Sequence, residues 1–417
     1  MRILHTADWH LGHRLYNRDR TPEHRGALEW LLKTVEAEEV DLVVLAGDVF
    51  DVTNPSNQAK ELYYEFLAGL VQTRCAAAVI VGGNHDSPSL LDAPRGLLRH
   101  LSLHVIGAAS ASPADRVFTI HCGDHSVLVA AVPYLRERDL RTSQFGESSE
   151  KRLERLRESI RDHFTDIAEA ASKARKDPSV PMLVTGHLFA AGASDDDEKK
   201  SYIYQADENN IQARHFPTCF DYVALGHVHR AQHVGEHDHV RYAGSLVPLT
   251  FVEGQRQRSV CLVDLKAAGE SVTVSKLPVP TQRKLVRLHA PLGQVKDELG
   301  RAVREATGDE LRPWVEVRVL TDDPIPNLRD KLNRVVLAAQ KTTDGPPAVE
   351  LLRISTERLT PRPEFHSPAE LRQLEELRAP DVFDQLCERQ SFSGPHRSEL
   401  QGDFAELYSW VEEQEEL

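Results

Sequence analysis

Five short segments of the sequence combine carboxylates, an amide and imidazoles, which are side chains that bind divalent cations. Each segment follows an apolar run, and four of the five begin with glycine. The segments are Asp8–His10, Gly47–Asp51, Gly83–Asp86, Gly186–His187 and Gly226–His229. Their candidate metal ligands are Asp8, His10, Asp48, Asn84, His187, His227 and His229. This set suits Mn²⁺, Fe²⁺ or Zn²⁺, and the absence of Cys from it disfavours a structural zinc site.

Seven candidate ligands are too many for one ion. Two ions about 3.5–4 Å apart, bridged by one carboxylate, would use them and leave positions for water and a phosphate oxygen. His227 and His229 lie two residues apart in an extended segment and would point to the same side, as would Asp8 and His10. The pattern therefore predicts a two-metal centre for in-line hydrolysis of a phosphoester.

His85 adjoins this centre without being needed to complete it. We predict that it is catalytic, either donating a proton to the leaving oxygen or stabilising the transition state. Its second ring nitrogen needs an acceptor to fix the tautomer, and Asp51 and Asp86 are both candidates. We favour Asp51, because Asp86 could instead cap the next helix. The alternative role for His85 is that of a further metal ligand.

Each cluster also has a purely structural interpretation. Asp8 and His10 could be a helix cap and a surface histidine, Asp48 could be an N-cap, and Gly186–His187 could belong to an ordinary turn. The metal interpretation depends on convergence, because the carboxyl ends of strands in an open α/β sheet meet at one edge.

Elements that could position the clusters alternate along the chain up to about residue 260. Short apolar runs rich in β-branched residues indicate strands buried on both faces. These runs are Ile3–Leu4, Leu42–Ala46, Ala78–Val81, Val127–Val132, Met182–Val184 and Tyr222–Leu225. Segments with helical apolar spacing lie between them, at Arg25–Glu39 and Lys60–Val71. We therefore expect a layered α/β catalytic domain over residues 1–280.

A smaller unit is expected at residues 281–358, after the proline-containing segment Leu277–Pro280. Its pattern predicts a βαβαβ order, and hence a small α+β cap domain. A second proline-containing linker, Thr360–Pro363, opens a helical tail over residues 359–417. The last helix of that tail has one apolar stripe, formed by Leu400, Phe404, Leu407, Tyr408 and Val411.

The composition of the 417-residue chain limits how it could bind a polyanion. With 50 Lys and Arg against 64 Asp and Glu, its formal charge of −14 argues against binding nucleic acid through bulk positive charge. The five scattered cysteines form no CxxC pair, which favours a reducing cytoplasm. No signal peptide or membrane span is expected from the apolar runs.

The five clusters, in this order, resemble the calcineurin-like metallophosphoesterase family, whose motifs are DxH, GDxxD, GNHD/E, GH and GHxH. More narrowly, three segments are similar to the bacterial SbcD nuclease family, the counterpart of archaeal and eukaryotic break-repair nucleases. They are Asp8–Gly12 (DWHLG), Gly82–Pro88 (GGNHDSP) and Phe220–Gln232 (FDYVALGHVHRAQ). The resemblance runs over the whole chain.

This resemblance implies two Mn²⁺ ions that share Asp48, with Mg²⁺, Fe²⁺ or Zn²⁺ as possible replacements. One ion would be held by Asp8, His10, Asp48 and His229, and the other by Asp48, Asn84, His187 and His227. His85 would be the catalytic histidine.

The resemblance also implies a substrate and partners. The family acts on DNA as a 3′-to-5′ exonuclease on duplex ends and an endonuclease on hairpins and single strands. It works in complex with an ABC-type ATPase, SbcC, whose coiled coil binds the C-terminal helices; the apolar stripe suits this docking, and its alternative is packing on its own chain. Homodimers would form through helices of the phosphoesterase domain, here Gln58–Val71 and Leu90–Leu101. With SbcC bound to the C-terminal helices, the assembly would be a heterotetramer.

Two features bear on how DNA could be held. The acidic segment Ala191–Asn210 could close over DNA or simply be solvated. Six arginines are candidates for contacting DNA phosphates: Arg14, Arg18, Arg20, Arg230, Arg256 and Arg258.

Two other functions remain open. One is a protein phosphatase or cyclic-nucleotide phosphodiesterase of the same family, although family phosphatases carry Arg after the second Asp of GDxxD, where this chain has Val52. The other is a non-catalytic scaffold that binds DNA ends, which the full set of competent ligands disfavours.

Overall fold

The computed structural model describes residues 1–110, 112–140, 149–191, 211–306, 310–340, 346–359, 383, 387 and 395–415. Residues 192–210 of the acidic segment, and the proline-containing linker from Thr360 onward, lie outside the described residues. The chain divides into two units, Met1–Glu357 and Arg358–Leu417. Each is described by itself below.

A six-stranded sheet carries the first three clusters, and its strand order is β16-β15-β1-β4-β5-β6. The strands are β1 (Arg2–Thr6), β4 (Leu42–Ala46), β5 (Ala77–Val81), β6 (Leu103–Ile106), β15 (Ser259–Asp264) and β16 (Thr273–Pro278). β1, β4, β5 and β6 pair in parallel, whereas β15 and β16 are antiparallel additions. The carboxyl ends of β1, β4 and β5 therefore lie at the same edge.

The second six-stranded sheet carries the other two clusters, in the order β13-β14-β12-β9-β8-β7. Its strands are β7 (Val117–Cys122), β8 (His125–Ala131), β9 (Met182–His187), β12 (Tyr222–Gly226), β13 (Gln232–Val234) and β14 (His237–Tyr242). β8, β9, β12 and β14 pair in parallel. β9 and β12 are neighbours, so Gly186–His187 and Gly226–His229 lie side by side.

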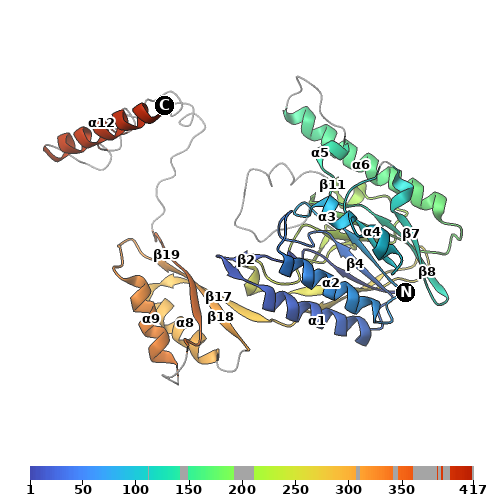
Figure 1. Cartoon of the computed structure of the whole chain (residues 1–417), viewed down its shortest axis with the longest axis horizontal. Helices are drawn as coiled ribbons and strands as arrows, with labels where there is room; N and C mark the ends of the chain where they lie inside the picture. The colour runs from blue at the N-terminus through green and yellow to red at the C-terminus, as the bar shows by residue number, and fades with distance from the viewer. Residues whose placement is uncertain are drawn as a thin grey trace. The chain divides into compact units, whose positions relative to one another are not determined.

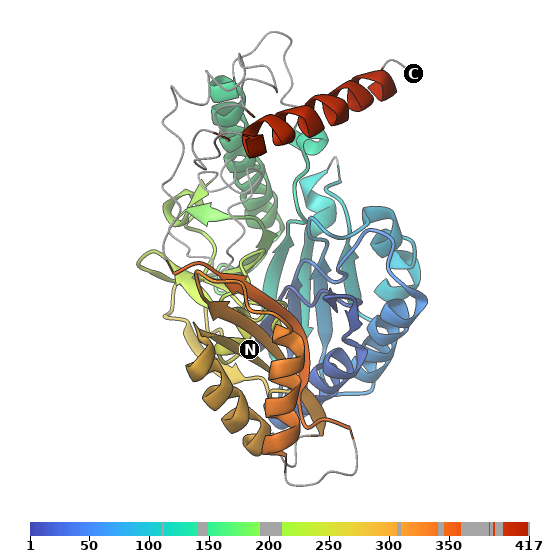
Figure 2. The same ribbon diagram turned by 90° about the vertical axis from the view of Figure 1, so that its left-hand side faces the viewer.

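The two sheets pack face to face through a shared apolar cluster that includes Ile3, Val44 and Val79 of the first and Val129 and Leu183 of the second. Helices α1 (Thr21–Ala37) and α2 (Asn57–Val71) cover the outer face of the first sheet, and α6 (Ser149–Ala174) covers that of the second. Figures 1 and 2 show α1 and α2 in blue on one side of the strands and α6 in green on the other. Each sheet is covered by helices on one face and by the other sheet on the other face, which explains why its strands are apolar on both faces. The predicted layered α/β fold is confirmed.

Short elements connect these layers. They are β2 (Arg14–Leu15), β3 (Arg18–Asp19), α3 (Pro88–Asp92), α4 (Arg95–Arg99), α5 (Glu137–Leu140), β10 (Ala190–Ala191), β11 (Ile211–Gln212) and the 3₁₀ turns Pro113–Arg116, Ala213–His215 and Glu253–Gln255.

A three-stranded parallel sheet ends the first unit, with strands β17 (Arg283–Pro291), β18 (Leu311–Leu320) and β19 (Glu350–Glu357) in that order. Helices α8 (Leu292–Glu305) and α9 (Leu328–Ala339) pack on it through a separate apolar cluster (Figure 1). The observed order is β-α-β-α-β. Residues 281–357 are called the cap below.

Buried charge joins the cap to the first sheet's helices. The Glu23 carboxylate accepts hydrogen bonds from Nε of Arg20 at 3.1 Å and from Nε of Arg283 at 2.7 Å. The Arg283 guanidinium also lies over the Trp314 ring, 4.2 Å from its centroid. An apolar cluster of Leu15, Phe251, Leu285 and Trp314 completes this contact.

The second unit contains α12 (Pro395–Glu415). Within this unit the Phe404 ring stacks on Phe383 at 4.1 Å, and the Leu407 side chain is 58% exposed. Part of the predicted apolar stripe therefore packs within its own unit, and part is accessible. The side chain of Val411 lies outside the described residues.

Candidate metal centre

The five clusters meet where the two stacked sheets share an edge. Asp8–His10, Gly47–Asp51 and Gly83–Asp86 follow β1, β4 and β5 of one sheet, while the two remaining clusters end β9 and β12 of the other. Convergence at the carboxyl ends of the strands was expected, within central sheets flanked by helices. The structure builds the site from two sheets, so each contributes ligands from one side.

Asp48 lies at the centre of this arrangement. Its Oδ2 atom is 3.5 Å from Nε2 of His10 and 3.3 Å from Nε2 of His187. Its other oxygen, Oδ1, accepts a hydrogen bond from the backbone N–H of His85 at 2.9 Å. One carboxylate oxygen of Asp48 therefore faces candidate ligands on both sides.

The group around His187 has the geometry of a metal site. Nδ1 of His187 lies 2.9 Å from the backbone oxygen of Ala46, which only accepts, so the proton of the neutral ring belongs on Nδ1. Its Nε2 lone pair then faces Asp48 Oδ2 at 3.3 Å and Asn84 Oδ1 at 2.9 Å. Three electron-rich atoms converge here, which is favourable when a metal ion lies between them or when Nε2 of His187 carries a proton.

His227 extends the same group, since its Nδ1 lies 3.1 Å from Asn84 Oδ1. Metal–ligand bonds of about 2.0–2.2 Å at right angles place neighbouring ligand atoms about 3 Å apart. The separations of 2.9 and 3.1 Å at Asn84 match that spacing. This group of residues fits a divalent metal.

A second group surrounds Asp8 and His10. Asp8 Oδ2 and His10 Nε2 are buried and have no hydrogen-bond partner among the described residues. Buried polar atoms normally have a partner, so two such atoms beside Asp48 indicate a binding position for a cation. The His10 ring is 5.0 Å from that of His229, whose Nδ1 lies 3.3 Å from Glu253 Oε1. The second group also fits a divalent metal.

The backbone at four candidate ligands lies in the left-handed region, with φ of 52° at Asp8, 46° at His10, 49° at Asp48 and 99° at His227. Such residues carry local strain that the surroundings must hold in place. Hydrogen bonds between the loops supply this support, because the N–H groups of Asp8 and His10 donate to the oxygens of Gly47 and Asp48, both at 3.0 Å. The clusters brace one another through their main chains.

Glycines in the clusters provide space as well as turns. Gly47 has a φ of 88°, and a Cβ there would lie 2.1 Å from Nδ1 of His187. At Gly83, where φ is not in the left-handed region, a Cβ would lie 2.1 Å from Oδ1 of Asp48. At both positions the absence of a side chain leaves room for a candidate ligand.

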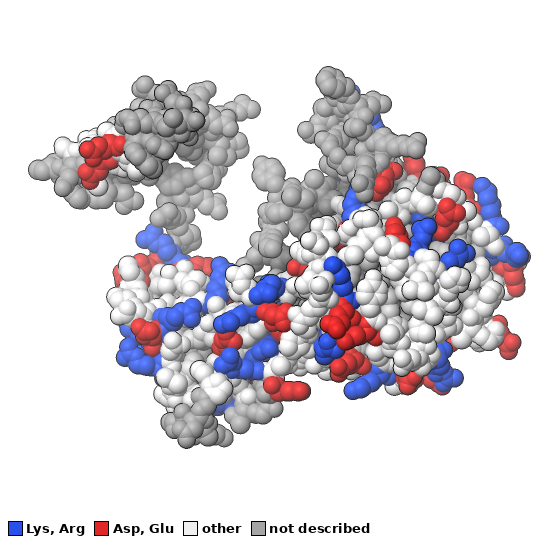
Figure 3. Space-filling model, in the orientation of Figure 1, with Lys and Arg blue, Asp and Glu red and all other residues white. Residues whose placement is uncertain are grey.

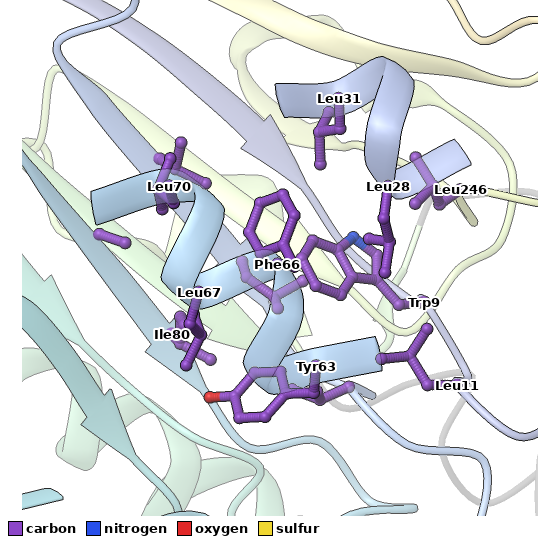
Figure 4. Packing of buried hydrophobic residues seen from close by; sticks show 14 of the residues in the cluster. Trp9, Leu11, Leu28, Leu31, Tyr63, Phe66, Leu67, Leu70, Ile80 and Leu246 are labelled. Carbon is purple, nitrogen blue, oxygen red and sulfur yellow. The ribbon is translucent and has the colours of Figure 1, made fainter. Parts of the chain in front are cut away.

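Trp9 holds the first cluster in place by packing in the core. It stands between two candidate ligands but points into the core, where its ring meets Phe66 edge-on at 4.8 Å (Figure 4). Its indole N–H donates to Oγ1 of Thr6 at 2.9 Å. Packing of Trp9 thus fixes the turn that presents Asp8 and His10.

His85 is oriented by a main-chain atom. Its Nδ1 lies 2.7 Å from the backbone oxygen of Asp51, so Nδ1–H donates and Nε2 is left for other contacts. The predicted partner residue is the one found, but it acts through its carbonyl. The Asp51 carboxylate instead lies 3.2 Å from Nδ1 of His10. His85 also belongs to a group with His10 and Asp48 whose ligand atoms lie within 4.8 Å of one another, so its alternative as a ligand stays open.

Asp86 has a role that the sequence did not indicate. Its fully buried carboxylate accepts hydrogen bonds from the N–H groups of Gly83, Phe50 and Val49, at 2.8, 2.9 and 3.0 Å. Asp86 does not cap the next helix, because the N-cap of α3 is Ser87. It holds the Asp48 loop against the Asn84 loop.

Sequence reasoning missed Glu253 and gave Arg258 a different role, contact with DNA phosphates. Glu253 contacts His229 through Oε1, and its Oε2 accepts from Oγ of Ser245 at 3.0 Å. Arg258 donates through Nη1 to the backbone oxygen of His229 at 2.7 Å. Neither belongs to a cluster or follows a ligand-bearing strand, so only the folded chain brings them to the site.

Electrostatics of the buried groups agree with a cationic centre. Burial alone would raise the pKa of Asp48, but the neighbouring His187 and His10 bring it well below its usual range. Burial opposes protonation of His187, yet Asp48 and Asp8 raise its pKa to about 9. Burial and His187 lower the pKa of His227 to about 3, which leaves a neutral imidazole, the form that binds metals.

Two of the arginines proposed for DNA contact are unavailable. Arg20 is buried against Glu23 and the backbone oxygen of Pro248, and Arg258 is buried against His229 and Glu253. These assignments were wrong, because both guanidiniums serve the fold. Arg18 pairs with Glu350 of the cap.

None of the described helices is long and apolar enough to cross a membrane.

Fold and site together define a calcineurin-like phosphoesterase, and the family model of that description matches residues 1–231. A second family model, described as the Type 5 capsule protein repressor C-terminal domain, matches residues 281–391. The first match covers the two-sheet domain as far as residue 231, and the second covers the cap and part of the tail.

Comparison with known relatives identifies the family within the calcineurin-like phosphoesterases. The SbcD component of the nuclease SbcCD from Escherichia coli K12 is 33% identical over 401 residues, which are 96% of each chain. The SbcD component from Rhodobacter capsulatus is 32% identical over 349 residues, which cover 81% of this chain and 85% of that one. The SbcD component from Bacillus subtilis 168 is 29% identical over 421 residues, which cover 100% of both chains. The chain belongs to the SbcD nuclease family, as its motifs predicted.

Proposed function

We propose that this chain is the nuclease component of an SbcCD-type complex that processes DNA ends in repair, recombination and replication. It hydrolyses phosphodiester bonds as a 3′-to-5′ exonuclease on duplex DNA and as an endonuclease on single strands and hairpins. The observation that carries the proposal is Asp48 Oδ2, placed between Nε2 of His10 and Nε2 of His187 at 3.5 and 3.3 Å. Full-length similarity to SbcD nucleases supports DNA as substrate.

Two divalent ions, Mn²⁺ in the cell, complete the site in this proposal. One would be held by Asp8, His10, Asp48 and His229, and the other by Asp48, Asn84, His187 and His227. Such ions would supply Lewis-acid chemistry, polarising the phosphate and lowering the pKa of water. Mg²⁺, Fe²⁺ or Zn²⁺ would use the same oxygen and imidazole ligands.

The chain's own groups orient and protonate the substrate. His85 is held through Nδ1–H by the carbonyl of Asp51, which leaves Nε2 for the substrate; in the imidazolium form of the ring, Nε2–H gives its proton to the leaving oxygen and the ring becomes neutral. Asp51 is a positioning residue here, because it acts through His85 and His10. Asp86 keeps the loops of Asp48 and Asn84 in register.

Other parts of the chain are assigned to partners. We assign 1–280 to the nuclease domain, 281–358 to a cap that contacts DNA, and 359–417 to docking on an SbcC-type ATPase coiled coil. A homodimer forms through α2 and the α3–α4 region, where Tyr64 and Leu97 are exposed at 41% and 69%. It joins the ATPase as a heterotetramer in the cytoplasm.

The test is cleavage of end-labelled duplex DNA by the purified chain with Mn²⁺, compared with hydrolysis of para-nitrophenyl phosphate. DNA cleavage that increases when an SbcC-type ATPase and ATP are added is the expected result. Cleavage of the small ester alone would replace the nuclease with a phosphatase. Binding of duplex ends without cleavage of either substrate would favour a scaffold.

A further inference from the structure

A hollow of about 490 Å³ opens beside the candidate metal centre. Three chain segments form it: His229–Ala231 after β12, Ala243–Ser245 after β14, and Arg256–Ser259 at the start of β15. Lys276 and Pro278 of edge strand β16 complete the lining. Because His229 is one of its lining residues, a group bound in the hollow lies next to one candidate metal ligand.

The charged residues that line the hollow are all positive. Its lining, among the described residues, contains Arg230, Arg256, Arg258 and Lys276 and not a single Asp or Glu. Arg258 is buried and pairs with Glu253, but Arg230, Arg256 and Lys276 are exposed. The chain as a whole carries a formal charge of −14, and Figure 3 shows Lys and Arg mixed with Asp and Glu on the drawn face. Three exposed cations beside the centre therefore stand out from an acidic background.

Hydrogen bonds hold the residues that line the hollow in place. Nη1 of Arg258 donates to the backbone oxygen of His229 at 2.7 Å and to Oγ of Ser245 at 3.2 Å. Gly244, with a φ of 79°, allows close approach, since a Cβ there would lie 2.7 Å from the N atom of Ala231. Nζ of Lys276 donates to the oxygen of Ala231 at 3.0 Å. The exposed cationic residues therefore lie on a surface that these hydrogen bonds hold in place.

We propose that this hollow is a phosphate subsite, in which Arg230, Arg256 and Lys276 hold a backbone phosphate of the DNA strand next to the scissile one. The inference rests on the nuclease function proposed above and specifies how that site holds its substrate. A flexible lysine and two arginines suit phosphate oxygens and leave base identity unread. The subsite explains how an acidic protein holds a polyanion, because its binding charge is local.

The test compares two triple variants in a His85→Ala background, which keeps the DNA intact during binding. The first is Arg230→Ala with Arg256→Ala and Lys276→Ala. The matched control is Arg25→Ala with Arg74→Ala and Lys173→Ala, which removes the same charge from exposed residues paired with Glu65, Glu39 and Glu169. Binding of a fluorescent duplex to the full chain is measured by anisotropy over a range of salt concentrations.

Each lost duplex phosphate contact lowers the slope of log K against log[salt] by about 0.9, which corresponds to up to about eightfold in Kd at 0.1 M salt. We expect the subsite variant to lose several-fold in affinity, up to about eightfold, and to have a slope shallower by about 0.9, while the control stays within about twofold. Equal Kd and slope in the parent and subsite variants would overturn the subsite.

The same substitutions with His85 intact are then assayed on bis(para-nitrophenyl) phosphate, a small diester that has no neighbouring phosphate for the subsite to hold. Unchanged turnover is expected, and it also shows that the variant is folded. Loss of small-diester turnover together with DNA binding would overturn the subsite in favour of a structural role. Failure of the proposed function is distinct: the unmodified chain would then hydrolyse the diester without binding or cleaving DNA.

Discussion

Oδ2 of Asp48 lies 3.3 Å from Nε2 of His187, with both side chains buried. The opposite ring nitrogen of His187 is already used by a main-chain carbonyl. Close approach of a carboxylate to this Nε2 therefore requires either a shared proton or a metal ion between them. The relationship makes Asp48 the residue on which both halves of the candidate centre depend.

Substitution Asp48→Ala is expected to reduce bound metal from two ions per chain to fewer than one and to abolish nuclease activity. The reason is that Asp48 Oδ2 faces His10 and His187 at once. Metal analysis after gel filtration measures the content directly. Asp238→Ala, at an 85% exposed side chain, is the control. Retention of two ions by the Asp48 variant would refute the bridging role.

His85→Ala is expected to keep metal and DNA affinity while its turnover falls by about 10²–10⁴. His85 is held by the Asp51 carbonyl and presents its other nitrogen to the site. Single-turnover cleavage of labelled duplex, alongside metal analysis, separates chemistry from binding. His125→Ala, at an exposed histidine, is the control. A parallel loss of bound metal would identify His85 as a ligand instead.

Asp86→Ala should destabilise the fold, because three buried N–H groups would lose their acceptor. Each unsatisfied donor costs about 1–3 kcal/mol, so a loss of at least about 3 kcal/mol in the free energy of unfolding is expected. Urea unfolding without metal measures it. Asp264→Ala, at a partly exposed ion pair with Arg2, should stay within about 1 kcal/mol. Similar losses in both variants would contradict a bracing role for Asp86.

Gly83→Ala is expected to weaken metal binding, since its Cβ would lie 2.1 Å from Oδ1 and 2.3 Å from the N atom of Asp48. The Asp48 loop would have to move, and the Oδ2 position would move with it. Gly96→Ala in α4 is the matched control, because its Cβ would meet nothing within 4 Å. Mn²⁺ titration by calorimetry compares the two variants. Identical isotherms would show that the space at Gly83 is not needed to position Asp48 for metal binding.

Glu253→Gln tests a residue that holds a ligand in place without touching the metal. Its Oε1 atom faces Nδ1 of His229 at 3.3 Å and orients that ring. Loss of such a partner typically costs about 10–100-fold in metal affinity. The expected result is weaker binding of one ion with the other unaffected, read from two-step Mn²⁺ titration. Equal weakening of both ions would point to a general loss of structure.

Local patterns predicted a large part of this structure. Runs such as Leu42–Ala46 are apolar and β-branched enough to indicate buried strands, and the polar segments after them indicate the site. The two-sheet arrangement is not visible locally, because nothing in Gly186–His187 says which strand β9 will pair with. The composition of a cluster predicts its chemistry, whereas pairing between distant strands depends on the whole core.

Supporting residues were harder to predict than ligands. Glu253 and Arg258 look like ordinary surface charges in the sequence, and only tertiary packing brings them against His229. Arg20 follows the first cluster as a phosphate-binding residue would, yet it is buried with Glu23. The acceptor of His85 is a backbone oxygen of Asp51, and every residue has one. Such roles depend on where a side chain ends up in space.

The Glu23 carboxylate binds both Arg20 and Arg283, and Arg283 belongs to the cap. This contact predicts how the protein behaves after proteolysis. A protease that cut the chain near Gln282 would leave the fragments bound, because Trp314 and Leu285 remain packed against Leu15 and Phe251. The nicked protein should therefore migrate as one species on a native gel and as two under denaturation. Shortening the chain before the cap would expose this apolar surface and the Glu23 charge to water, and the remaining fragment should aggregate.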